Sequence, residues 1–182
     1  MLDKNTGLTL KTQLPMLWYR VAILVVIGDQ LVKRLVTAKL QLQPPLELLP
    51  VLELGYAENT GAAFSFLHNA GGWQRWFFTA IALVVGTGIA IWMARLKSEQ
   101  RLLLSSLALV LGGAIGNLID RMRFGYVVDF ISAHWGDHYF PAFNVADSAI
   151  TIGAGLMLLD MMLHPHHHNS KTSPGLDKGE TK

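Results

Sequence analysis

Two long apolar segments without a single charge constrain the fold of this chain more than any other feature. They run from Trp76 to Ala94 and from Leu102 to Ile119, and each approaches the roughly 20 apolar residues that a helix needs to cross a bilayer. The composition agrees, because 51% of the 182 residues are hydrophobic and only 15% are charged. That is too few charges for the surface of an ordinary soluble domain. The sequence therefore predicts a membrane protein.

Two further apolar segments, 14–31 and 142–163, carry a few charges but otherwise suit the membrane. With the first two segments, here taken as spans 76–94 and 102–119, they predict one all-α membrane domain of four transmembrane helices. The first span is expected to be retained rather than cleaved as a signal peptide, because no small-residue A-x-A site follows its apolar core.

The distribution of lysine and arginine predicts how this bundle is oriented. Most of these residues lie before the first span, in the short link between the second and third spans, and in the tail. The positive-inside rule assigns such segments to the cytoplasm. We therefore expect both termini to be cytoplasmic and the two longer connections to lie on the outer side.

The two outer connections, 36–72 and 121–141, differ in pattern. The first mixes prolines with short, partly alternating apolar runs, which predicts a small periplasmic β-platform. The second contains VVDFISAHW, and we expect an interfacial periplasmic segment there. The polar tail, 164–182, is expected to be disordered.

Several classes of function are disfavoured by composition. Cysteine is absent, which excludes disulfides, thiolate metal sites and a cysteine nucleophile. The basic residues are scattered rather than gathered into one stripe, so no nucleic-acid partner is expected. The run HPHHH at 164–168 is more often solvated than metal-binding when it lies in a polar tail, and no metal site is predicted.

The unusual polar residues all fall at one depth, near the outer ends of the predicted spans. A spacing of three or four residues places side chains on one helical face, as in the pair Asp29 and Lys33. Polar groups inside a membrane are costly and default to a functional interpretation. The candidate site residues are Asp29, Lys33, Asn59, Asn117, Asp120, Arg121, Asp129, Asn144 and Asp147.

These residues do not all carry the same signal. Asp29 with Lys33 fits an ordinary ion pair between helix ends as well as a functional role. Asp129 and Asp147 differ, because neither has a basic residue within four positions. Asn144 fits a helix cap, but a cap does not by itself account for Asp147 one turn later.

Two carboxylates brought to one site of low dielectric tend to share a proton. One of them can take a proton from a water molecule that attacks a peptide carbonyl, while its protonated partner polarises the carbonyl oxygen. This chemistry needs no metal or cofactor. Two alternatives are a small proton-coupled transporter and a scaffold whose polar residues only hold helices together. Acids near one surface and the lack of an obvious inverted repeat argue against transport.

The chain resembles the lipoprotein signal peptidases, the bacterial type II signal peptidase family, over nearly its whole length. The resemblance rests on five blocks that occur in order and at compatible separations. They are DQLVK (29–33), NTGAAFSF (59–66), GGAIGNLIDR (112–121), VVDF (127–130) and FNVADS (143–148).

The resemblance implies an aspartic endopeptidase of the bacterial inner membrane, with its active site on the periplasmic side. It would cleave prolipoproteins N-terminal to a diacylglyceryl-modified cysteine and would bind the antibiotic globomycin; a monomer without cofactors is expected. Asp129 and Asp147 match the catalytic pair, and the other seven candidates match positions that support the site or contact substrate. Because Arg121 directly follows Asp120 and should favour its ionised form, we expect a supporting salt bridge there.

Overall fold

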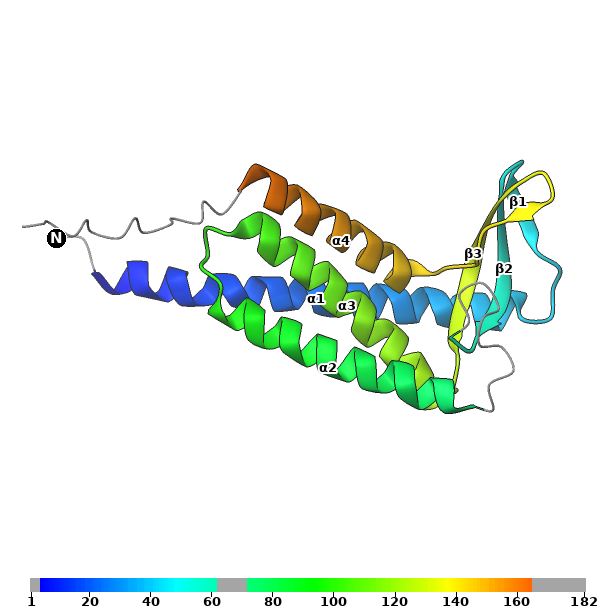
Figure 1. Cartoon of the computed structure of the whole chain (residues 1–182), viewed down its shortest axis with the longest axis horizontal. Helices are drawn as coiled ribbons and strands as arrows, with labels where there is room; N and C mark the ends of the chain where they lie inside the picture. The colour runs from blue at the N-terminus through cyan, green and yellow to red at the C-terminus, as the bar shows by residue number, and fades with distance from the viewer. Residues whose placement is uncertain (1–3, 62–71, 165–182) are drawn as a thin grey trace, which may run out of the picture.

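A bundle of helices carries a small sheet across one end (Figure 1). The computed structural model describes residues 4–61 and 72–164, with side chains from Met16 onward. The helices of this part are α1 (Lys4–Leu40), α2 (Trp73–Arg95), α3 (Arg101–Arg123) and α4 (Val145–Leu163). Helix α3 packs against each of the other three helices. Helix α1 begins and α4 ends at the end of the bundle opposite the sheet (Figure 1), here called the far end; the other is the sheet end.

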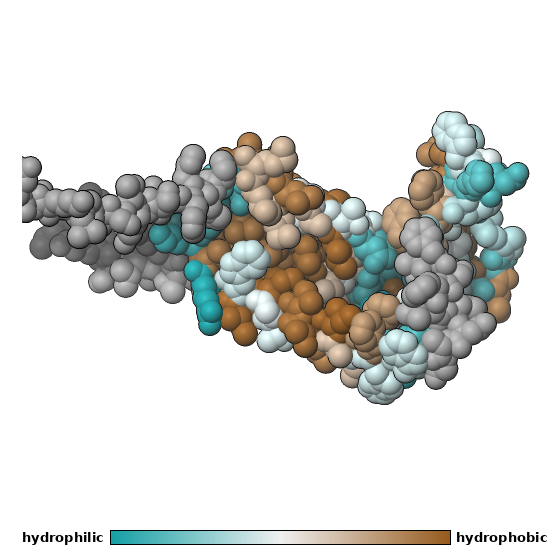
Figure 2. Space-filling model, viewed as in Figure 1, coloured by the Kyte–Doolittle hydropathy of each residue, from teal (hydrophilic) through white to brown (hydrophobic). Residues whose placement is uncertain are grey.

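Three helices in the described part of the chain are long and apolar enough to cross a membrane. They are α2, α3 and α4, with mean hydropathies of 2.1, 2.1 and 1.5. Helix α1, which contains the predicted span 14–31, is not among them; Arg20, Asp29 and Lys33 interrupt its apolar stretch. Apolar side chains cover much of the outside of the bundle (Figure 2), as expected of a surface that faces lipid.

The helix boundaries correct several predicted ones. Helix α1 continues to Leu40, so the connection predicted from residue 36 begins later; the first proline after residue 36 is Pro44. Helix α3 continues to Arg123, which places Arg121 in its last turn rather than in the next connection. Helix α4 begins at Val145 rather than at residue 142, because Asn144 caps it. The predicted disordered tail lies outside the described residues, apart from its first position.

The sheet has four strands, β1 (Leu46–Leu49), β2 (Leu52–Asn59), β3 (Val127–Trp135) and β4 (His138–Tyr139). They pair antiparallel in the order β1-β2-β3-β4. Strands β1 and β2 confirm the prediction for the first connection. The second connection, where an interfacial segment was predicted, forms strand β3, which pairs with β2. The two connections therefore build one platform.

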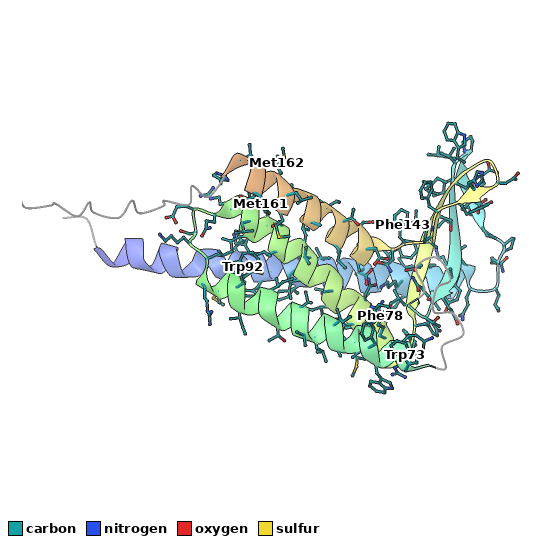
Figure 3. All side chains as sticks on the ribbon, in the orientation of Figure 1. Trp73, Phe78, Trp92, Phe143, Met161 and Met162 are labelled. Carbon is teal, nitrogen blue, oxygen red and sulfur yellow. The ribbon has the colours of Figure 1, made fainter. Side chains whose placement is uncertain are left out.

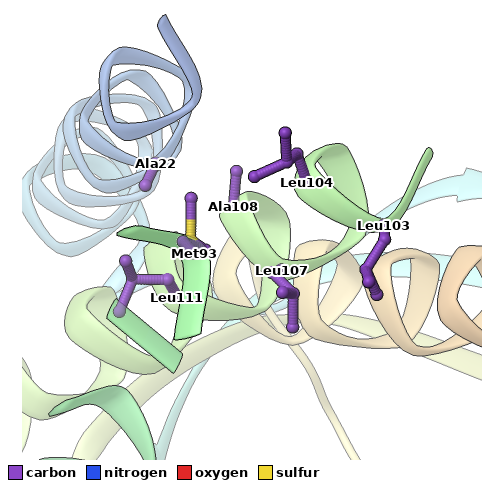
Figure 4. Packing of buried hydrophobic residues seen from close by; sticks show 7 residues of the cluster. All are labelled: Ala22, Met93, Leu103, Leu104, Leu107, Ala108 and Leu111. Carbon is purple, nitrogen blue, oxygen red and sulfur yellow. The ribbon is translucent and has the colours of Figure 1, made fainter. Parts of the chain in front are cut away.

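The far half of the bundle is held by an apolar cluster (Figure 4). Met93 of α2 and Leu104 of α3 are completely buried in it. The cluster consists of Ala22, Met93, Leu103, Leu104, Leu107, Ala108 and Leu111. Glycine lets α1 approach α3 closely, since a Cβ atom added at Gly112 would lie 2.7 Å from the Ala22 carbonyl oxygen.

Aromatic side chains mark the sheet end of α2. Trp73 and Phe78 lie there, whereas Trp92 lies near the far end (Figure 3). Trp73 and Trp76 are both exposed on the helix surface. Tryptophan is enriched where a membrane helix leaves the hydrocarbon for the headgroups, so the sheet end of α2 has the character of a membrane boundary.

Candidate active site

The candidate residues meet at the sheet end of the bundle, where the last turns of α3 contact α1, β3 and the first turn of α4. Asp29, Asn144 and Asp129 are 0%, 0% and 1% exposed. Such complete burial of polar groups requires that each be paired. The hydrogen bonds and ion pairs described below connect eight of the nine predicted residues through their side chains.

Lys33 of α1 is the positive centre of this network. Its Nζ atom lies 2.9 Å from Asp29 Oδ2 and 2.8 Å from Asp120 Oδ2, and it donates to Asn117 Oδ1 at 3.0 Å. The predicted pair of Asp29 with Lys33 is confirmed. One buried ammonium thus pairs with two buried carboxylates and orients an amide, all within hydrogen-bonding distance.

Asp120 differs from its prediction. We expected a salt bridge to Arg121, but in the described part of the chain Asp120 pairs with Lys33 and accepts the Val128 amide at 3.1 Å. Consecutive helix residues point about 100° apart, so Asp120 faces α1 while Arg121 faces elsewhere. Arg121 instead donates to the Asn117 carbonyl at 3.4 Å and lies over the Phe78 ring.

The start of α4 is fixed by a reciprocal cap. Asn144 Oδ1 accepts the Asp147 amide at 2.9 Å, and Asp147 Oδ2 accepts the Asn144 amide at 3.3 Å. Asp29 adds a third bond by accepting the Ala146 amide at 2.9 Å. The expectation that a cap does not account for Asp147 was therefore wrong, because this carboxylate is the second half of a capping box.

Asp129 projects from β3 and receives an amide donor on each oxygen. Asn144 Nδ2 donates to Oδ1 at 2.6 Å, and Asn59 Nδ2 donates to Oδ2 at 2.8 Å. The pKa of Asp129 is raised to about 6 as the net result of several causes. Burial is the largest and raises it, and the charge of Asp147 acts in the same direction; the bonds from Asn59 and Asn144 and the charge of Lys33 lower it. Asp129 can therefore gain or lose a proton near neutral pH.

Asp147 is tied to Asp129 through two asparagines. Asn117 Nδ2 donates to Asp147 Oδ1 at 2.7 Å, while Asn117 Oδ1 accepts Asn144 Nδ2 at 3.2 Å. Asn144 in turn donates to Asp129. The two acids thus share an amide framework, and the negative charge of one perturbs the other.

Gln30 belongs to the network but was missed. Its Nε2 atom donates to Asp120 Oδ1 at 2.8 Å and to the Gly116 carbonyl at 3.2 Å. The signal was present in the sequence, since Gln30 is an uncharged polar residue in an apolar stretch and follows Asp29. Its amide occupies the oxygen of Asp120 that Lys33 leaves free.

Within residues 4–61 and 72–164, no group of three or more His, Cys, Asp or Glu side chains is placed to hold a metal ion. The arrangement offers one buried acid, Asp129, and one half-buried acid, Asp147, with amide donors on both oxygens of each. Such a pair can exchange protons with a water molecule and a peptide bond.

Known proteins are similar to this chain in sequence. A sequence model of signal peptidase (SPase) II matches residues 21–163. Lipoprotein signal peptidase from Shewanella woodyi is 50% identical over 143 residues, 79% of this chain and 81% of its own length. The same enzyme from Shewanella loihica is 46% identical over 154 residues, 85% of this chain and 91% of its own length.

Solved structures agree with these matches. Two structures described as a bacterial membrane enzyme superimpose with TM-scores of 0.71 and 0.69, at 28% and 29% sequence identity. The first covers 88% of this chain and 94% of its own, and the second covers 80% and 92%. The family model, the relatives and the fold lead to one conclusion: this chain belongs to the signal peptidase II family.

Proposed function

We propose that this chain removes the signal peptide from prolipoproteins by aspartic chemistry, with Asp129 and Asp147 as its catalytic pair. Membership of the signal peptidase II family supports the reaction. One observation carries the assignment of the pair. Both acids lie in one amide framework at the sheet end, and the pKa of Asp129 is raised to about 6 by burial and by its neighbour.

The pair divides the work of hydrolysis. One carboxylate takes a proton from water as the water oxygen attacks the carbonyl carbon of the scissile peptide bond. Its protonated partner hydrogen-bonds to the carbonyl oxygen, which gains negative charge in the transition state. When the carbon–nitrogen bond breaks, a proton passes from the pair to the leaving amine. All protons are exchanged between water, substrate and the two acids.

The other candidate residues place the acids. Asn59 and Asn144 donate to Asp129, and Asn117 donates to Asp147. Lys33 joins α1 to α3 through Asp120, and Asp29 holds the first turn of α4. A displacement of about 1 Å can cost a hundredfold in rate, so these residues matter to turnover without touching the reacting bond.

The membrane setting supports a lipid-bearing substrate. We propose a single membrane domain of the bacterial inner membrane with α1 as the fourth span, both termini cytoplasmic and the sheet on the periplasmic side. The cut would fall N-terminal to the diacylglyceryl-modified cysteine. The acyl chains would stay in the bilayer against the apolar bundle, while the peptide crosses the acids at the sheet end. Globomycin would inhibit a monomeric enzyme.

Two observations disfavour the transporter and scaffold alternatives. The relatives are peptidases, which does not support transport. A scaffold would need no titratable pair, yet Asp129 carries a pKa near neutrality.

The test is cleavage of a lipidated precursor by the purified chain in liposomes, read by gel shift and by product mass. Asp129→Asn and Asp147→Asn are each expected to abolish cleavage while remaining inserted and folded. Asp160→Asn is the matched control, because Asp160 lies on α4 at the far end and pairs there with His164. Near-normal cleavage by either of the first two variants would sink the assignment.

Two further arms of this experiment address the substrate. The product mass is expected to show a cut directly before the lipid-bearing cysteine, and globomycin is expected to block it. An unlipidated precursor is expected to be cleaved far more slowly. Equal rates for the two precursors would contradict the placement of the acyl chains in the bilayer.

A further inference from the structure

A cavity lies beside the acid network, between the sheet-end half of α1 and the last turn of α3. Its volume is about 210 Å³, and its lining includes Lys33, Arg34 and Thr37 of α1 and Arg123 of α3. Asp129 and Asp147 do not line it. The cavity is therefore separate from the place where a scissile peptide would meet the two acids.

The cavity is positively charged. Its only acidic lining residue is Asp120, and both oxygens of that carboxylate are already bound by Gln30, Lys33 and the Val128 amide. Arg34 and Arg123 have no carboxylate within ion-pair distance in the described part of the chain; Arg123 lies over the Phe124 ring at 5.0 Å. Two guanidinium groups at one cavity are thus available to an anion.

Phosphate is one of the anions that guanidinium groups bind well. The planar fork of arginine matches the oxygens of a phosphate and binds them with two parallel hydrogen bonds. Thr37 adds a hydroxyl that can donate a further bond.

The surroundings indicate that this phosphate belongs to a lipid. Ala38, which lines the cavity, shares a face of α1 with Leu31 and Leu35 at spacings of three, four and seven residues. Leu31 and Leu35 are 54% and 58% exposed. An apolar strip thus runs from the cavity along α1 towards the far end, where acyl chains would lie.

The depth of the cavity in the membrane also agrees with a lipid phosphate. It lies at the end of α3, a candidate span whose apolar run gives way to Arg121 and Arg123. Charged residues at a span end lie at headgroup level.

We propose that this cavity binds the phosphate of an anionic phospholipid in the leaflet at the sheet end. Arg34 and Arg123 hold the phosphate oxygens, Thr37 donates to them, and the acyl chains follow Leu31 and Leu35. The diacylglyceryl group of the proposed substrate carries no phosphate. The bound lipid is therefore a membrane component distinct from the substrate.

The test titrates the delipidated full chain in neutral detergent micelles with dioleoyl phosphatidylglycerol and counts bound lipid by native mass spectrometry. Arg34→Gln and Arg123→Gln are each expected to weaken binding by about tenfold, because each removes charged hydrogen bonds to the phosphate. Lys39→Gln is the matched control: it removes an exposed cation from the same helix outside the cavity and is expected to bind like the parent chain.

Two other ligands separate the sources of the phosphate. Dioleoylglycerol, which has the chains but no phosphate, and inorganic phosphate, which has no chains, are both expected to bind at least tenfold more weakly than the phospholipid. Equal binding of dioleoylglycerol would overturn the phosphate contact. Equal binding of inorganic phosphate would overturn the claim that the ligand is a lipid. Both comparisons use the parent chain, so they stand even if a variant fails to fold.

Discussion

The two halves of the bundle are held together by opposite means. In the far half, α1, α2 and α3 meet through the apolar cluster around Met93 and Leu104. At the sheet end, α1, α3 and α4 meet through Lys33, its two carboxylates and the amides that surround them. Helix α3 takes part in both, so one helix changes its mode of packing along its length.

The difference teaches what buried polarity achieves here. Apolar packing is non-directional and tolerates small shifts of side chains, whereas hydrogen bonds constrain both distance and angle. A buried ion pair is weak evidence of stability, since an apolar replacement of both partners is often as stable. The polar end is best explained by the need to place Asp129 and Asp147, and the far half by the need to hold the bundle.

Removing the charge at the polar end should give the largest loss of stability. Lys33→Met leaves Asp29 and Asp120 buried without their cation, which costs roughly 3–5 kcal/mol. Unfolding in mixed micelles titrated with sodium dodecyl sulfate measures this. Lys39→Met, at an exposed position on the same helix, should change little; equal effects of the two variants would show that the buried network does not hold the sheet end.

A cavity in the far half should cost less and leave the chemistry intact. Leu104→Ala removes a fully buried side chain, with an expected loss of about 2–3 kcal/mol. The cleavage rate per folded molecule should stay near that of the parent chain. Leu158→Ala is the control, because this side chain is exposed on α4; both its stability and its cleavage rate should match the parent chain. A large drop in the cleavage rate for Leu104→Ala would show that the two halves are not separable.

The smallest expected effect is a shift in pH dependence. Asn59 donates to Asp129 and thereby lowers its pKa. In Asn59→Ala the carboxylate of Asp129 loses a hydrogen-bond donor, so the pKa of Asp129 should rise. The limb of the pH–rate profile near pH 6 should therefore move to higher pH. Asn59→Asp is unsuitable as a control because it adds a charge; Glu58→Gln, a neighbour without a bond to Asp129, serves instead. An unmoved limb would separate Asn59 from the titrating group.

Much of this arrangement could be predicted from the sequence. The two uncharged runs and the apolar segment 142–163 correspond to the three helices that are able to cross a membrane. Prolines with short alternating apolar runs predicted β1 and β2. The convergence of the candidate residues followed from reading each helix in its direction, which places Asp29, Asn117 and Asp147 at one depth.

Two of the errors concerned partners that only tertiary packing selects. Arg121 is next to Asp120 in sequence, but Lys33 is next to it in space. Strand β3 could not be paired with β2 from local pattern, since register depends on a strand distant in the chain. The capping role of Asp147 could have been predicted from the local pattern Asn144-x-x-Asp147.

The central claim is that Asp129 and Asp147 act as one catalytic unit, and a double-mutant cycle tests it most directly. Single-turnover cleavage of a lipidated precursor would be measured for Asp129→Asn, Asp147→Asn and the double variant, with unfolding measured on the same samples. Groups that act as a unit are strongly non-additive. We predict that each single variant loses about a thousandfold or more in rate and that the double variant loses no more than either. Losses that multiply in the double variant, or a single variant that keeps near-normal turnover, would contradict the account.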